Sequence, residues 1–265
     1  MTKREFFIHE FKIGLKSYKT AISTIFNNKM AIYFVIPFIL NIVLLIFGIK
    51  YIFELVEYST KIFREWINFD SSDFLGRSFV KEFFYGLITT ILYIVFFITY
   101  MLISGNIITI LLSPMFSLIS EKTDTLLTGN EYKFELKQFL KDIFRGIFIS
   151  ARNTIIELFF MVIMLFVSFI PVIGFFSPVF MLIISAYFYG FSFLDYSNER
   201  NKMSIRKSVE FVRKHKGLVI SNGLVFSIFL FIPFCGSFIA IFVSIISVVA
   251  ATISAVQVND LNIKK

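Results

Sequence analysis

Two serines stand where this chain is expected to begin helices inside its least polar stretches. Ser177 precedes Pro178, and Ser237 follows a turn of similar sequence. A serine hydroxyl can cap the free backbone donors of a helix start, and proline suits the first helical position. Because a helix start also presents unpaired N–H groups and a positive dipole end, both serines are candidates for binding an anion. The alternative is that they are structural caps.

A third serine–proline pair, Ser113–Pro114, predicts another helix start. That helix would run to Thr128, where Gly129 supplies a C-terminal stop.

Other chemistry has little support in the sequence. His9 and His215 lie in charged stretches without metal-ligand spacing, and Cys235, the only cysteine, excludes an internal disulfide. The chain has no G-x-x-x-x-G-K-[ST] loop for nucleotide hydrolysis, and its uncharged segments contain no paired catalytic groups. We therefore predict no enzyme activity, no catalytic residue, no metal site and no cofactor.

The elements that position these serines are expected to lie in lipid. Hydrophobic residues make up 57% of the chain and charged residues 17%, against about 45–50% and about 25% in soluble proteins. A helix of about 20 apolar residues crosses the hydrocarbon layer of a bilayer. Four segments hold no charged residue: Met30–Ile49, Phe83–Ser120, Leu158–Leu194 and Gly217–Asn259. The sequence predicts an integral membrane protein whose partner is the lipid bilayer.

The distribution of Lys and Arg favours a topology in which the third and fourth segments fold back as hairpins. With the N-terminus inside, this arrangement leaves outside only the five Lys and Arg residues of Lys50–Glu82. Single crossings would also place outside the basic connector Asp195–Lys216. The positive-inside rule supports the hairpins. The net charge of +8 then reflects cytoplasmic loops, and we predict no nucleic-acid partner.

Both expected hairpins contain the sequence F-I-P-x-x-G, at residues 169–174 and 231–236. Pro171 and Pro233 remove a backbone donor and interrupt a helix, while Gly174 and Gly236 permit the dihedral angles of a reversal. We predict hairpin turns at these four residues. Either the hairpins enter only part of the bilayer, or they are ordinary pairs of crossing helices.

The chain is expected to form a single helical membrane domain over residues 1–265. Its parts are an amphipathic cytoplasmic-face helix (1–29), two long transmembrane helices (30–120) with a connecting loop (50–82), and an amphipathic helix (121–157). A hairpin (158–194), a basic cytoplasmic loop (195–216) and a second hairpin (217–259) follow. The fold class is therefore all-α: a polytopic helical membrane protein with two long transmembrane helices and two membrane-inserted helical hairpins.

Several segments resemble, in order, those of the CysZ-type sulfate permeases and their relatives, the etoposide-induced membrane proteins. The similar segments are IPFILNIVLL (36–45), SPMFSLISEKTDTLLTG (113–129), FIPVIG (169–174) with Pro178, and LDYSNERNKMSIRKSVEFVRKHKGLVISNG (194–223). Together they extend over about residues 10–260. None is a catalytic signature.

The resemblance implies a multi-pass protein of the bacterial inner (cytoplasmic) membrane, a homo-oligomer that passes sulfate into the cell for cysteine biosynthesis. Sulfate permeases of this family carry two arginines just before the first-helix proline, where this chain has Ala31 and Ile32. Lys29 is the nearest basic residue, and Lys29 with Asn28 completes the set of candidate anion-binding residues. We expect an anion permease with an inorganic anion such as sulfate as substrate. The alternative is a non-transporting membrane scaffold or accessory protein of the same fold.

Overall fold

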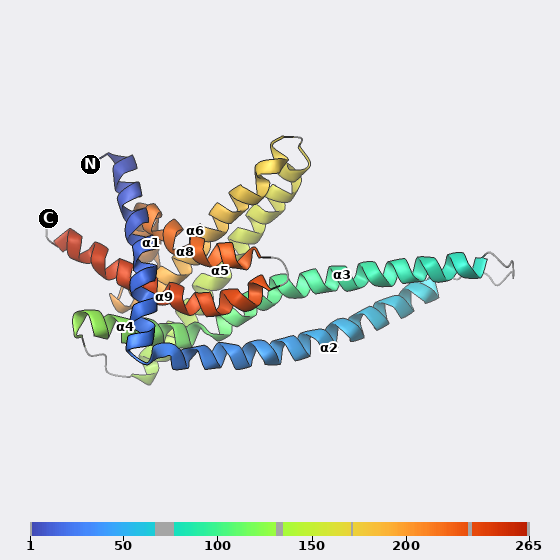
Figure 1. Cartoon of the computed structure of the whole chain (residues 1–265), viewed down its shortest axis with the longest axis horizontal. Coiled ribbons are helices and arrows are strands. Elements are labelled where there is room, and N and C mark those ends of the chain that lie inside the picture. The colour runs from blue at the N-terminus through green and yellow to red at the C-terminus, as the bar shows by residue number, and fades with distance from the viewer. Residues whose placement is uncertain (1, 67–76, 131–134, 171, 233–234, 264–265) are drawn as a thin grey trace. The chain divides into compact units, whose positions relative to one another are not determined.

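The computed structural model describes residues 2–66, 77–130, 135–170, 172–232 and 235–263 (Figure 1). Within these residues every regular element is a helix, and no strand occurs. The helices in chain order are α1 (Lys3–Asn27), η1 (Met30–Phe34), α2 (Val35–Trp66), α3 (Arg77–Leu111), α4 (Ser113–Thr128), α5 (Leu136–Ser168), η2 (Gly174–Phe176), α6 (Ser177–Arg200), α7 (Ile205–Lys214), α8 (Lys216–Leu230) and α9 (Gly236–Ile263).

The fold class is the predicted one, an all-α polytopic membrane protein. Four stretches of the described residues are long and apolar enough to cross a bilayer: Met30–Glu65, Phe144–Ser168, Gly174–Arg200 and Phe238–Asn259. The chain divides into two compact units, and each is described by itself. The first unit contains Met1–Phe38 and Ile108–Lys265, and the second contains Ile39–Ile107. Whether the whole chain forms one membrane domain stays a prediction.

The second unit is an antiparallel pair made of most of α2 and α3. Its register is visible in three contacts along its length. The Tyr100 hydroxyl donates to the Leu44 carbonyl at 2.9 Å, and the rings of Phe53 and Tyr93 meet edge to face. The Arg64 guanidinium lies over the Tyr85 ring, 5.1 Å from its centre. Between α2 and α3, side chains such as Ile52 and Val56 are buried.

The first unit contains the two predicted hairpins, α5–η2–α6 and α8–α9. The first hairpin begins earlier than expected, because α5 continues without a break from Leu136 to Ser168 across the boundary placed at residue 158. Likewise, the basic connector is not a simple loop, since α6 extends to Arg200 and α7 follows. Helix α8 has 15 residues, or about 22 Å, and so is shorter than the roughly 30 Å hydrocarbon layer.

Small residues determine where α6 and α8 cross. A Cβ added to Gly190 would lie 1.9 Å from the Val219 carbonyl oxygen, and one added to Gly223 would lie 1.8 Å from the Ala186 carbonyl oxygen. The two backbones are therefore in direct contact. Lipid tails are as apolar as leucine, so such close packing of small residues is a principal source of helix association in a membrane.

The glycines of the predicted turns act differently from the expectation. Pro171 and Pro233 lie outside the described residues, but Gly174 and Gly236 are described, and neither has a positive φ. A Cβ at Gly174 would lie 2.2 Å from the Ser168 carbonyl oxygen, so glycine is needed there for close approach of the backbone. Gly236 is similar, with 2.5 Å to the Leu230 carbonyl oxygen. The left-handed residue of the first turn is instead Val172, with a φ of 67°.

The predicted helix from Ser113 to Thr128 is confirmed as α4, and Gly129 ends it with a φ of 74°. The predicted capping by serine is wrong for α4 and α6. In both helices the serine is already the first helical residue, the residue before it has helical backbone angles, and no side chain caps the helix. Because its backbone is already helical, the serine has no cap geometry and its hydroxyl points elsewhere.

Candidate functional site

The predicted anion-binding residues Asn28 and Lys29 lie at the corner between α1 and η1. The Asn28 side-chain amide donates to the Thr24 carbonyl at 2.9 Å, which closes the end of α1. Lys29 follows in the left-handed conformation, with a φ of 56°, and its side chain is exposed. The chain thus turns sharply at Lys29 and presents one positive charge at the corner.

Ser177 lies at the start of α6, in the first hairpin. Its hydroxyl donates to the Met164 carbonyl of α5 at 3.0 Å, so it joins the two limbs of the hairpin. Ser237 lies in the first turn of α9, and its side chain is outside the described part of the structure. Figure 1 shows the end of α1 and the starts of α6 and α9 at three separate places. The structure therefore does not bring the four predicted residues into one site.

A second cation near Lys29 was not predicted. The Lys122 ammonium of α4 lies over the ring of Tyr33, 5.5 Å from its centre. Tyr33 is in η1, four residues after Lys29, and a 3₁₀-helix rises only about 2 Å per residue. Lys29 immediately precedes η1 and Lys122 contacts its tyrosine, so both lysines lie next to the same short segment. No local sequence signal indicates this pairing, because it depends on how α4 packs against η1.

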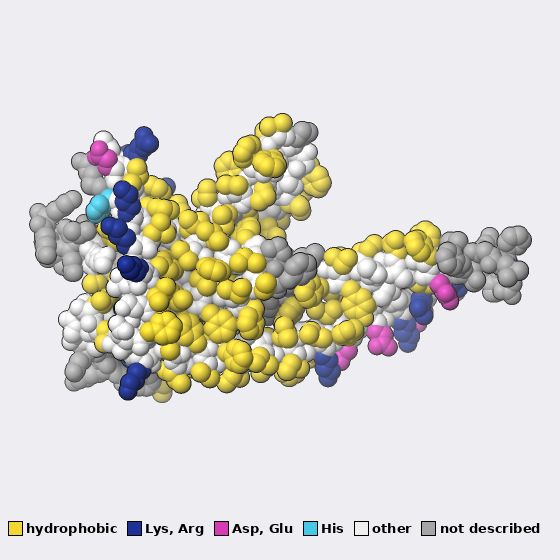
Figure 2. Space-filling model, viewed as in Figure 1, with side chains coloured by type: hydrophobic (Ala, Val, Ile, Leu, Met, Phe, Trp, Pro, Cys, Tyr) yellow, Lys and Arg dark blue, Asp and Glu magenta, His cyan; other side chains and the backbone are white. Residues whose placement is uncertain are grey.

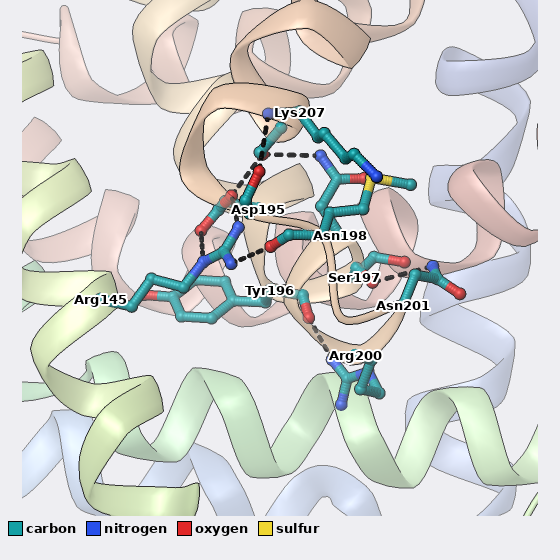
Figure 3. A network of polar contacts seen from close by, with 11 residues as sticks. Arg145, Asp195, Tyr196, Ser197, Asn198, Arg200, Asn201 and Lys207 are labelled. Atoms are coloured by element: carbon teal, nitrogen blue, oxygen red, sulfur yellow. Dashed lines mark hydrogen bonds and ion pairs between the residues drawn. The ribbon is translucent and has the colours of Figure 1, made fainter.

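A network of polar contacts surrounds Asp195 near the end of α6 (Figure 3). Arg145 of α5 donates to both carboxylate oxygens of Asp195, from Nε at 3.1 Å and from Nη2 at 2.9 Å. Its Nη1 donates to the Met203 carbonyl, and the Ser208 hydroxyl donates to Asp195. The network thus joins α5, α6, the connector after α6, and α7.

Arg200 extends this network toward α4 and α9. Its guanidinium donates to the Ser117 carbonyl at 3.2 Å, to the Ser120 hydroxyl, and to the Tyr196 carbonyl at 2.9 Å. The Ser120 hydroxyl in turn lies 2.6 Å from the Thr252 hydroxyl of α9. Figure 3 shows Arg200 on the opposite side of Tyr196 from Arg145.

The role of this network is structural, because an ion pair holds α5 against α6. The side chains of Arg145 and Asp195 are 13% and 4% exposed and form a forked, charge-assisted pair. Since Asp195 neutralises Arg145 and occupies its donors, Arg145 cannot bind a sulfate without losing this pair. The sequence predicted an amphipathic helix over residues 121–157, which include Arg145. Its partner is 50 residues away, so the pairing could not be read from local periodicity.

Further polar groups lie inside the first hairpin. The Ser185 hydroxyl donates to Glu157 at 2.5 Å, and the Asn153 amide donates to the Ser192 hydroxyl at 3.1 Å. Glu157 was placed just outside an uncharged segment, whereas the structure places it within the candidate span Phe144–Ser168. A carboxylate at that position costs free energy if it faces lipid. Glu157 instead faces protein, where it accepts the hydrogen bond from Ser185.

His215 lies in the charged stretch where the sequence places it, but its side chain is buried there. It is 2% exposed and its Nδ1 is hydrogen-bonded to Glu10 Oε1 of α1. The rings of Phe6 and Phe211 lie against the imidazole. Among the described residues, His, Cys, Asp and Glu side chains form no group of three that could hold a metal ion.

These features define a class. The chain is an all-α polytopic membrane protein, and some of its polar groups are buried between helices. A family model described as sulfate transporter CysZ/etoposide-induced protein 2.4 matches residues 17–256, so the chain belongs to this family. No curated protein sequence matches the chain closely enough to count as a relative. The predicted family resemblance is therefore confirmed.

Proposed function

We propose that this protein is a permease for an inorganic oxyanion, sulfate being the favoured ion, in the bacterial inner membrane. Its membership in the sulfate transporter CysZ/etoposide-induced protein 2.4 family carries the proposal. By the same reasoning, the protein works as a homo-oligomer, is not an enzyme, and supplies sulfate for cysteine biosynthesis.

The pair of lysines at η1 supports an anion site at the α1–η1 corner. Lys29 begins this segment and Lys122 lies over its tyrosine. Two ammonium groups from different helices supply the charge to attract a dianion, although without the forked geometry that arginine offers. Asn28 is the neighbouring polar group. In this proposal Ser177 and Ser237 belong to the hairpins and would meet the ion only deeper in the bilayer.

Uptake of labelled sulfate by proteoliposomes tests the proposal. We expect flux above empty vesicles for the native chain, and a loss of about tenfold when Lys29→Gln and Lys122→Gln are combined, as for two missing charge contacts. Lys207→Gln, an exposed lysine of α7, is the matched control and is expected to retain full flux. Absence of native flux at every pH would refute the permease function.

The second candidate function is a non-transporting scaffold of the same fold. Two observations favour it: Arg145, which the structure buries, is neutralised by Asp195, and the positions of the arginine pair carry Ala31 and Ile32. Ile32 is 66% exposed, so an arginine fits there without repacking. A gain of sulfate binding in the double variant Ala31→Arg/Ile32→Arg would indicate an inherited anion site. No gain, together with no native flux, would favour the scaffold.

A further inference from the structure

Helix α1 has three faces, and the first is buried inside the first unit. Glu10 bonds His215, and the Tyr18 hydroxyl donates to the Asn222 carbonyl of α8 and lies 2.9 Å from the Ser247 hydroxyl of α9. A Cβ at Gly14 would lie only 1.9 Å from the Ser221 hydroxyl oxygen. This face fixes the orientation of α1, so its other two faces point in defined directions.

The second face is an exposed apolar stripe. Ile8, Leu15, Ile22 and Phe26 are 40%, 40%, 46% and 67% exposed. Their spacing of seven and four residues places them in one row along the helix. Tyr18 and Ile25 are apolar residues of the same helix but do not belong to this stripe, because both are buried.

The third face is a row of exposed lysines beside that stripe. Lys12 lies three residues before Leu15 and Lys19 four residues after it, so both lie next to the stripe. Lys16 lies between these lysines along the chain and is farther round the helix from the stripe. No acidic residue occurs from Phe11 to Lys29 in the sequence. Figure 2 shows Lys and Arg side chains in a row along α1, next to hydrophobic side chains.

We propose that α1 is a docking surface for anionic phospholipids. The apolar stripe enters the boundary between headgroups and acyl chains, and Lys12, Lys16 and Lys19 bind the lipid phosphodiester groups. An apolar row beside a basic row is the arrangement of helices that lie in the interface plane. Charge complementarity selects the lipid, because no acidic residue accompanies the lysines between Phe11 and Lys29, and Glu5 lies two turns before Lys12. This inference needs no anion transport and stands apart from the permease function.

The test compares the full-length protein in bilayers that contain spin-labelled phosphatidylglycerol or spin-labelled phosphatidylcholine. A lysine near an anionic surface strengthens the attraction about fivefold at low salt. We expect the native chain to prefer phosphatidylglycerol severalfold, and high salt to remove most of this preference. The triple variant Lys12→Gln/Lys16→Gln/Lys19→Gln is expected to bring the ratio close to one.

The control variant removes three exposed lysines near α7, as Lys207→Gln/Lys214→Gln/Lys216→Gln. Helix α7 has no large apolar side chain among the exposed ones, so it lacks the accompanying stripe. The control is expected to keep the preference for phosphatidylglycerol. If the α1 triple variant keeps it too, or the control loses it equally, the proposal is wrong.

A second measurement locates the stripe directly. In a Cys235→Ser background, a nitroxide on Ile22→Cys is expected to collide with oxygen more than with a water-soluble nickel complex, as at the acyl boundary. A label that faces water would overturn the proposal. Spin–spin broadening between labels would also overturn it, because a second copy of the chain would then cover the stripe.

Discussion

The two units of this protein place glycine in different surroundings. In the first unit, residues 1–38 and 108–265, glycines such as Gly190 and Gly223 allow backbones to touch. In the second unit, residues 39–107, a Cβ at Gly48 would lie 2.2 Å from the Tyr100 ring, whereas one at Gly86 would meet nothing within 4 Å. The crossing of α6 and α8 is therefore sensitive to the volume of a single methyl group, and the Gly86 position of α3 is not.

Charged residues show the same contrast. The first unit buries Arg145 with Asp195, whereas the second unit places its charges along one exposed side of α2. Those charges recur at three- and four-residue spacing: Lys50, Glu54, Glu57, Lys61, Arg64 and Glu65. Large apolar side chains of α2, among them Tyr51, Phe53 and Tyr58, are 57–66% exposed. The first unit also exposes large apolar side chains, such as Phe175 at 83%, so both units depend on the lipid or protein around them, and the first additionally holds an ion pair between its helices.

The largest expected effect comes from breaking the buried ion pair. Asp195→Asn leaves Arg145 without its counter-charge, and loss of one partner of a buried pair costs about 3–5 kcal/mol. Glu54→Gln is the matched change in the second unit, where Lys50 and Glu54 are 69% and 56% exposed, and it is expected to cost less than about 0.5 kcal/mol. Denaturant unfolding in detergent micelles measures both values.

A double variant sharpens this prediction. Arg145→Met with Asp195→Leu removes both charges, so it should recover part of the stability lost in Asp195→Asn. Equal destabilisation by Asp195→Asn and Glu54→Gln would contradict the contrast between the units.

The next effect concerns the crossing of α6 and α8. Gly223→Ala places a methyl group 1.8 Å from the Ala186 carbonyl oxygen, and the backbones must separate, at about 2–3 kcal/mol. Gly86→Ala is the control, and it should stabilise α3 by about 0.5–1 kcal/mol through helix propensity. Thermal unfolding followed by circular dichroism measures both. A neutral Gly223→Ala would mean that the two helices do not touch at this point.

The sequence predicted what depends on composition and local pattern. Uncharged length predicted the helices that can cross a membrane, and Gly129 predicted the end of α4. It did not predict contacts between distant segments. Arg145 was predicted only as part of the amphipathic helix 121–157 and His215 only as part of a charged stretch, because local periodicity cannot show that Asp195 and Glu10 lie beside them.

The candidate site illustrates the same limit. The helix starts at Ser113 and Ser177 were located correctly from the serine–proline pairs, but the hydroxyls were assigned the wrong partners. A cap is a local interaction, whereas the bond from Ser177 to Met164 joins two limbs of a hairpin. Lys122 was missed for the same reason, since its relation to Tyr33 arises only when α4 packs against η1.

A smaller effect is expected at Tyr18, which joins α1 to α8 and α9. Burial raises the pKa of Tyr18 above its ordinary value of 10.0, and its hydrogen bond to the Ser247 hydroxyl opposes this only in part. The unfolded chain therefore loses the Tyr18 proton above about pH 10 while the folded chain keeps it. Stability should be unaffected by this group below pH 10 and should fall as the pH rises further.

Tyr18→Phe tests this expectation. It removes the hydroxyl and its hydrogen bonds, at about 1 kcal/mol near pH 7, and should make the loss of stability above pH 10 less steep. Tyr58→Phe is the control in the second unit, because Tyr58 is 66% exposed. An identical pH profile for native protein and Tyr18→Phe would show that Tyr18 ionises as freely in the folded chain as in the unfolded one.

The smallest effect is expected at the exposed residue Leu55 of α2, which is compared with its buried neighbour Val56. Val56 is 1% exposed within the second unit, and Val56→Ala should cost about 1–2 kcal/mol, whereas Leu55 is 46% exposed and Leu55→Ala should cost less than about 0.5 kcal/mol. Both variants are measured by thermal unfolding in detergent and again in bilayers. Detergent and lipid tails solvate leucine alike, so the Leu55 value should not change between them. If Leu55→Ala becomes as costly as Val56→Ala in bilayers alone, then a second copy of the chain, rather than lipid, covers this side of α2.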